Sequence, residues 1–112
     1  MNYLSLQVRE KLGLIIAVRA VHYLTGGAEI IDDAEGGSSR KREDAFHDIC
    51  EGYGFVNSLR YVVKADGSRY FDDATVDGYL ATLDSGDGMW DVTSADLIDI
   101  ADHIAAKGVG GL

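Results

Sequence analysis

The sequence predicts an all-α domain, a small bundle of about four helices, and three observations support this. Proline is absent from all 112 residues, so the strongest helix breaker is missing. Apolar residues recur at spacings of three and four along several segments. Glycine-rich stretches separate those segments and mark helix ends. We expect two long, antiparallel central helices and two shorter ones, within a single domain that spans residues 1–112.

The first helix is expected from Ser5, which can cap its amino end, to Leu24, just before the Gly26–Gly27 pair. Its main apolar face carries Val8, Leu12, Ile15, Val18 and His22. Its opposite face carries the small residues Gly13, Ala17 and Ala20. A neighbouring backbone can approach that second face closely. Because apolar residues cover most of the circumference, we expect this helix at the centre of the bundle.

Residues 25–39 are acidic and rich in glycine. A connector of this length is commonly either functional or disordered. The composition favours disorder, because it offers little apolar surface to bury. We therefore expect a flexible connector between the first two helices.

The second helix is expected from Ser39 to about Val63. Its inner face is predicted to carry Phe46, Ile49, Cys50, Tyr53 and Val56. A second apolar row in its carboxyl-terminal half indicates deeper burial there. The Asp66–Gly67 pair marks a turn, across which Val62–Val63 and Tyr70–Phe71 can pair as a short hairpin.

The two remaining helices have clearer start signals. The third is expected to begin after Asp72 or Asp73 and to end at the glycine-rich segment 84–88. Before the fourth, Thr93 and Asp96 have the spacing of a capping box, with aspartate in place of the usual glutamate. The fourth helix is expected to end at Gly108.

The charge balance restricts the partners. Nineteen acidic residues against ten basic ones give a net charge of −9, which disfavours binding to nucleic acid. The longest uninterrupted apolar run, residues 12–18, is too short to span a bilayer, and no signal peptide is recognisable. The single cysteine, Cys50, excludes an intrachain disulfide. We expect a soluble chain whose partner is a second copy or another protein.

A polar stripe on the second helix is the candidate metal site. Asp44, His47, Asp48 and Glu51 follow one another at helical spacing. Carboxylate and imidazole ligands of this kind suit divalent zinc, iron or manganese. His22 becomes a further ligand only if it meets His47 or Glu51. The alternatives are a solvated acidic face and a structural network inside the bundle.

The direction of this stripe decides between those alternatives. It continues into Gly54 and Ser58, and the small-residue face of the first helix can pack against them. The stripe would then point inward. Buried like charges require a cation or raised pKa values, so that orientation favours a metal.

Two segments carry a family resemblance. Residues 47–61, HDICEGYGFVNSLRY, resemble a helix of imelysin-like bacterial proteins, and resemble still more a related group of exported bacterial proteins of unknown function. Residues 89–96, MWDVTSAD, are similar to the start of their final helix. The resemblance implies an all-helical fold, a periplasmic or cell-envelope location and, for the imelysin branch, a link to iron uptake. If the chain is not related to these proteins, a cytoplasmic location is expected.

This chain also departs from the imelysin pattern. It lacks the Gly-x-His-x-x-Glu motif and is much shorter, so either a carboxyl-terminal fragment or a small independent relative is expected. Only His47 and Glu51 carry over as site residues.

Two functions of different class follow from the sequence. The first is a non-catalytic binding or assembly domain that forms homo-oligomers through an apolar face of the first helix, which has more apolar surface than three partner helices can cover. The second is a domain that binds a divalent metal through His47 and Glu51. Enzymatic activity is the weakest option, because no nucleophile–base pattern is recognisable.

Overall fold

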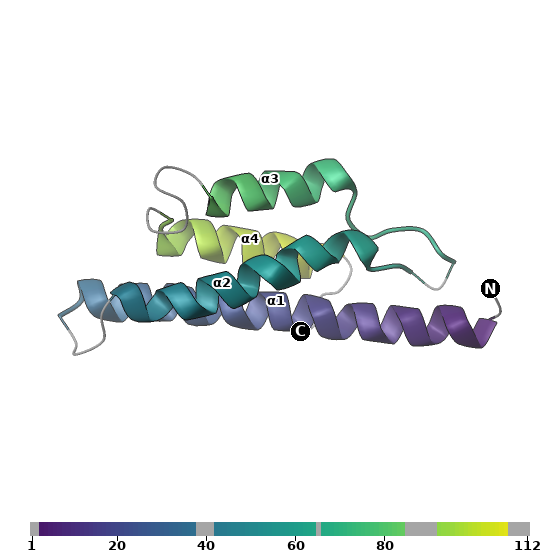
Figure 1. Cartoon of the computed structure of the whole chain (residues 1–112), viewed down its shortest axis with the longest axis horizontal. Coiled ribbons are helices and arrows are strands. Elements are labelled where there is room, and N and C mark those ends of the chain that lie inside the picture. Colours follow the sequence, from purple (N-terminus) through teal and green to yellow (C-terminus); the bar gives the residue numbers. More distant parts are fainter. Residues whose placement is uncertain (1–2, 38–41, 65, 85–91, 108–112) are drawn as a thin grey trace.

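One long helix, α1 (Tyr3–Glu35), runs the length of the molecule and organises the rest (Figure 1). The computed structural model describes residues 3–37, 42–64, 66–84 and 92–107. At 1.5 Å per residue α1 is about 50 Å long, close to the 53 Å longest dimension of the molecule. The amino-terminal turns of α1 extend beyond the ends of the other helices.

Three further helices complete the bundle. α2 (Arg42–Ser58) returns antiparallel to α1, and α4 (Ser94–Ala106) packs on α1 as well. α3 (Asp73–Leu83) contacts α2 and α4 and forms the outer layer in Figure 1. The predicted all-α bundle of four helices is confirmed within the described residues.

α1 continues through most of the segment expected to be a flexible connector. Residues 25–35 are helical, and only residues 36–37 of the described part form a turn; residues 38–39 lie outside it. The prediction was wrong because Gly26 and Gly27 allow close packing here and do not end the helix. A Cβ atom on Gly27 would lie 3.2 Å from Ile49 Cγ1 and 3.4 Å from Leu97 Cδ1. Ile30 and Ile31, just beyond, are buried and hold this part of the helix in place.

The buried face of α1 is the one made of small residues. Ala17 and Ala20 are fully buried, and a Cβ atom on Gly13 would lie 2.7 Å from Val62 Cγ1. The predicted close approach of a neighbouring backbone is therefore confirmed. The expected main apolar face, in contrast, lies outside the bundle.

α2 is shorter than predicted and is rotated. It ends at Ser58 and tightens into a 3₁₀ helix, η1 (Leu59–Tyr61), in place of an α-helix reaching Val63. Of the predicted inner face, Ile49 and Val56 are buried, Phe46 and Tyr53 are half-buried, and Cys50 is exposed. Gly52 takes the inward position, since a Cβ atom there would lie 3.3 Å from the Leu24 side chain. The deeper burial of the carboxyl-terminal end is confirmed by Leu59 and Val62.

A short connection leads from η1 to α3. The expected hairpin is reduced to one antiparallel bridge between Val63 and Arg69, with Lys64 N–H donating to Ser68 O at 2.7 Å. The turn is held by Asp66, which accepts hydrogen bonds from the Ser68 hydroxyl at 2.6 Å and the Ser68 N–H at 2.9 Å. The side-chain bond and then the backbone bond lower the pKa of the Asp66 carboxyl.

Both shorter helices begin at the predicted caps. Asp72 caps α3 by accepting the Thr75 N–H at 2.7 Å. Thr93 and Asp96 form the predicted capping box of α4, with N···O distances of 3.1 and 3.3 Å. The capping patterns in the sequence therefore predict correctly where α3 and α4 begin.

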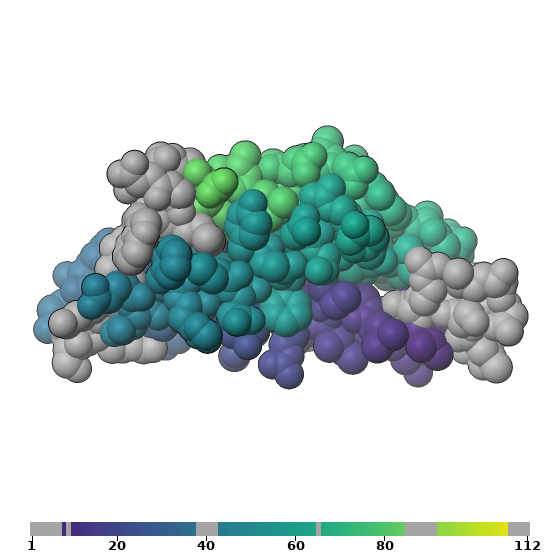
Figure 2. Space-filling view, viewed as in Figure 1, coloured from purple at the N-terminus to yellow at the C-terminus, as the bar shows by residue number. Residues whose placement is uncertain are grey.

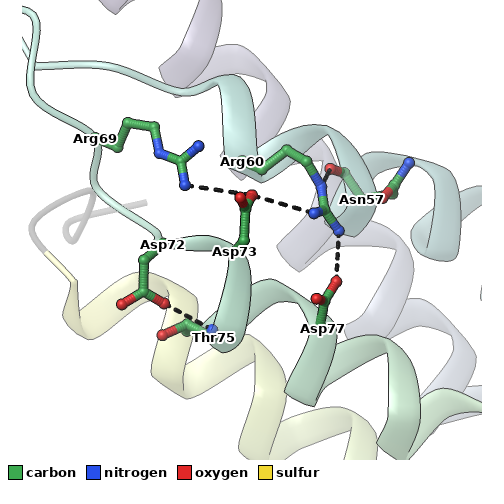
Figure 3. A network of polar contacts seen from close by, with 7 residues as sticks. All are labelled: Asn57, Arg60, Arg69, Asp72, Asp73, Thr75 and Asp77. Carbon is green, nitrogen blue, oxygen red and sulfur yellow. Dashed lines mark hydrogen bonds and ion pairs between the residues drawn. The ribbon is translucent and has the colours of Figure 1, made fainter.

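An ion-pair network joins η1 and the loop to α3 (Figure 3). Arg60 donates to Asp77 at 2.9 Å and to Asp73 at 3.2 Å, and Arg69 lies 3.3 Å from the same Asp73 carboxylate. The hydrogen bond to Asp77 is the largest cause of the raised pKa of Arg60. The network fixes the start of α3 against the end of η1.

The core between these elements is apolar, and no polar or charged residue among those described is buried. Its largest fully buried side chains are Phe71, Leu24, Ile31, Leu59, Leu83, Leu97 and Ile104.

Candidate functional site

Four large apolar side chains form an exposed stripe on the amino-terminal half of α1, which we name the apolar ridge. Val8, Leu12 and Ile15 are each 56% exposed, and Val18 is 40% exposed. Their spacings of four, three and three residues place them along one side of the helix. The surface-facing side of a helix in a soluble domain is normally polar, so this ridge is an unusual feature of the described surface.

The packing of α1 explains why the ridge faces outward. Gly13 and Ala17 have little or no side chain, so the backbones of α1 and its neighbours can come together over them. Val62 fills the space beside Gly13, and the large side chains on the other side of α1 are left uncovered. Figure 2 shows the purple residues of this half of α1 along the lower edge of the molecule, beyond the carboxyl-terminal end of α2.

A shallow hollow of about 350 Å³ continues from the carboxyl-terminal end of the ridge. It is lined by Val18, Val21, His22, Thr25, Gly26 and Glu29, all on α1. The hollow and the ridge share Val18, so they form one continuous surface. Gly26 forms the border of the hollow toward α2, where a Cβ atom on it would lie 2.9 Å from Asp48 Oδ2.

Exposed charges on α1 separate by sign along the helix. Lys11 lies in the amino-terminal half, Arg19 lies at the midpoint of the helix, and Glu29, Asp32 and Glu35 lie in the carboxyl-terminal half. Within the part of the chain that the structure describes, no ion pair engages Lys11, Arg19 or Glu29. These charges are therefore available to a partner.

The predicted metal residues do not converge. Asp44, His47 and Glu51 are exposed on α2, Asp48 is half-buried, and His22 is exposed on α1. Across residues 3–37, 42–64, 66–84 and 92–107, no group of three or more His, Cys, Asp and Glu side chains is placed to hold a metal ion. A site made of fewer protein ligands stays a prediction.

The inward orientation that favoured a metal is also wrong. Gly54 is exposed, and nothing lies within 4 Å of a Cβ atom built on it, so the small face of α1 does not pack there. That face packs beside Val62, and Gly52, on another side of α2, meets Tyr23 and Leu24. The carboxylate of Glu51 consequently faces solvent. Cys50 is exposed, but slight burial of its thiol and then the neighbouring Glu51 charge raise the pKa of this thiol. It is therefore a poor nucleophile.

The sequence carries no signal for a polar contact between α3 and α4. The Tyr79 hydroxyl lies 3.1 Å from His103 Nδ1, beside a hollow of about 210 Å³ that Asp96 and Asp99 also line. Burial and the Asp72 charge raise the pKa of Tyr79. A phenol of raised pKa is a weak acid that stays protonated at neutral pH, so this contact is a hydrogen bond that holds the two helices together.

Within Glu10–Glu35 of α1, an 18-residue window has the length and composition of a membrane span, with a mean hydropathy of 1.4. Of this window, 39% is buried inside the bundle, and core helices of soluble proteins have the same composition. The expectation that the chain has no membrane span stays a prediction.

Comparison with known proteins places the chain in a family. Residues 4–109 match the family model "Domain of unknown function (DUF4856)", so the chain belongs to that family. No curated protein and no solved structure matches it. The resemblance to imelysin-like proteins is not confirmed by these comparisons.

Proposed function

We propose that this member of the DUF4856 family is a non-catalytic assembly domain that pairs with a second copy of itself through α1. The observation that carries the proposal is the apolar ridge, with four large side chains 40–56% exposed on one side of the helix. Neither a core role nor a solvated surface accounts for such a stripe.

The size of the ridge sets the expected strength of pairing. Covering a half-exposed Val, Leu or Ile gains about 1 kcal/mol, so the two ridges of a pair together gain about 8 kcal/mol. Association costs about 4–15 kcal/mol in lost freedom before other contacts are counted. The gain and the cost are similar, and the hollow and the charges of α1 add further contacts. A micromolar dissociation constant would need about 8 kcal/mol of net gain, so we expect a weak, reversible dimer with a dissociation constant in the high-micromolar to millimolar range.

A second copy fits this surface better than the other classes of partner do. The net charge of −9 disfavours nucleic acid and anionic lipid, and it also opposes the pairing of two copies, so the pair depends on the local match between their α1 surfaces. A second copy, in contrast, provides both a ridge and a hollow. Self-complementary surfaces of this kind are what a two-fold symmetric dimer requires.

Sedimentation equilibrium over a wide concentration range tests the proposal. We expect the wild type to form dimers and the Leu12→Ser/Ile15→Ser variant to be monomeric with an unchanged helical circular dichroism spectrum. Ile98→Ser is the control, because Ile98 is an apolar residue of α4 that is 37% exposed and is not part of the ridge. It should dimerise like the wild type.

A wild type that stays monomeric at millimolar concentration overturns the proposal. Binding of the monomer to neutral lipid vesicles, lost in the Leu12→Ser/Ile15→Ser variant, also overturns it by assigning the ridge to a lipid surface.

The likeness of residues 47–61 and 89–96 to imelysin-like exported proteins supports a cell-envelope location for this assembly. Fractionation of cells that produce the chain tests the location, and recovery in the cytoplasm alone contradicts it.

A further inference from the structure

We infer that the two copies pair with their α1 helices antiparallel, so that Lys11 of each copy faces Glu29 of the other. This inference rests on the proposed function and specifies the geometry of the pair. Charge and shape support it independently.

The first argument is the separation of charge. The exposed base Lys11 lies toward the amino-terminal end of α1, and the exposed acids from Glu29 onward lie toward the other end, with Arg19 at the midpoint. A parallel pair places like charges beside each other at both ends. An antiparallel pair places opposite charges together at both ends. Because contacts between like charges strongly disfavour an arrangement, the antiparallel pair is favoured.

The second argument is the match between the ridge and the hollow. In a parallel pair ridge meets ridge and hollow meets hollow, which leaves the hollow empty. In an antiparallel pair the ridge of each copy meets the hollow of the other. Three contacts between the copies have residue 20 as their common centre: Lys11 with Glu29, Ile15 with Thr25, and Val18 with His22.

One two-fold axis at the level of residue 20 therefore satisfies all three pairings. Ile15 lies in the ridge, and Thr25 and His22 line the hollow. The two Arg19 side chains come near this axis, which offsets part of the attraction and keeps the pair weak.

Charge reversal separates this arrangement from its alternatives. We expect Lys11→Glu and Glu29→Lys each to weaken dimerisation about ten-fold, because each change turns two attractive contacts into two repulsive ones. The double variant, Lys11→Glu/Glu29→Lys, restores both contacts with reversed sign. Its dissociation constant should return to within about three-fold of the wild type.

Glu29→Lys provides the most informative comparison. It reduces the net negative charge, so a general charge effect would strengthen pairing, whereas the antiparallel contact predicts weakening. Lys107→Glu, with the same charge change as Lys11→Glu at the end of α4, is the control and should bind like the wild type within about two-fold.

The outcomes of this experiment distinguish the inference from the proposed function. A wild type that does not dimerise overturns the proposed function. If the wild type dimerises and both single variants dimerise as tightly as the wild type, only the antiparallel pairing is overturned. The same conclusion follows if the double variant dimerises as weakly as the single variants.

Discussion

Gly13 of α1 and Val62, just after η1, are packed so closely that a Cβ atom on Gly13 would lie 2.7 Å from Val62 Cγ1 and 3.3 Å from Val62 Cα. This contact fixes which side of α1 is buried. The side chains of the apolar ridge consequently point away from the bundle.

Replacing Gly13 with alanine should destabilise the fold. The added methyl group overpacks against a stiff, β-branched side chain, which costs about 1–3 kcal/mol, while the gain in helix propensity is about 1 kcal/mol. We expect a net loss of about 1 kcal/mol in the free energy of unfolding. Urea unfolding followed by circular dichroism measures it.

Gly54→Ala is the matched control for this change. Gly54 is also inside a helix, and nothing lies within 4 Å of a Cβ atom there, so the substitution should stabilise the protein by about 0.5–1 kcal/mol. Equal effects of the two substitutions would contradict the packing described for Gly13. Adding Val62→Ala to Gly13→Ala should recover part of the loss.

Asp72 should make stability depend on pH in the acid range. Hydrogen bonds from the side chain and the backbone N–H of Thr75 lower the pKa of Asp72 below its ordinary value of 3.8. A carboxyl with a lowered pKa in the folded state contributes stability above its unfolded pKa. That stability is lost as the pH falls through the folded pKa.

Asp72→Asn isolates this contribution, because asparagine can still cap the helix but cannot ionise. The wild type should be the more stable protein at pH 7, and the difference should shrink as the pH falls below about 4. Urea midpoints between pH 7 and pH 2.5 measure this. A difference that stays constant over that range would show that the Asp72 charge does not stabilise the fold.

Divalent metals should bind weakly. Zinc sites in proteins normally use three or four protein ligands, and His47 and Glu51 provide two from an exposed turn of α2. Titration calorimetry with zinc, iron(II) and manganese should show no stoichiometric uptake at micromolar concentration, and the melting temperature should not rise. Tight binding by the wild type that His47→Ala abolishes would establish the metal site and contradict this expectation.

The elements that could be predicted from the sequence are those specified by local chemistry. The caps at Asp72 and Thr93 satisfy the first N–H groups of α3 and α4, so short sequence patterns were sufficient to place both helices. The number of helices follows from apolar periodicity in the same way. These features do not depend on long-range packing.

The extent of α1 could not be predicted because tertiary contacts overrule glycine. Gly26 and Gly27 weaken an isolated helix by about 1 kcal/mol each. In the bundle, Gly27 lies against Ile49 and Leu97, and buried Ile30 and Ile31 offset that cost. Nothing in the local sequence distinguishes such a packing glycine from a terminating one.

The candidate site was predicted in part. An excess of apolar surface on α1 was expected, but the sequence did not indicate which of its apolar faces stays uncovered. Both faces of α1 are apolar, and the smaller residues are buried because they allow a closer approach of backbones. The same rotational ambiguity left the direction of Glu51 on α2 open, and the structure places it in solvent.

Intermolecular nuclear Overhauser effects test the central claim, pairing through α1, most directly. A sample mixing isotope-labelled and unlabelled chains shows only contacts between copies. We predict effects from the Leu12, Ile15 and Val18 methyl groups of one copy to Thr25 and His22 of the other. Contacts between copies that involve only other surfaces, or none at millimolar concentration, would contradict the claim.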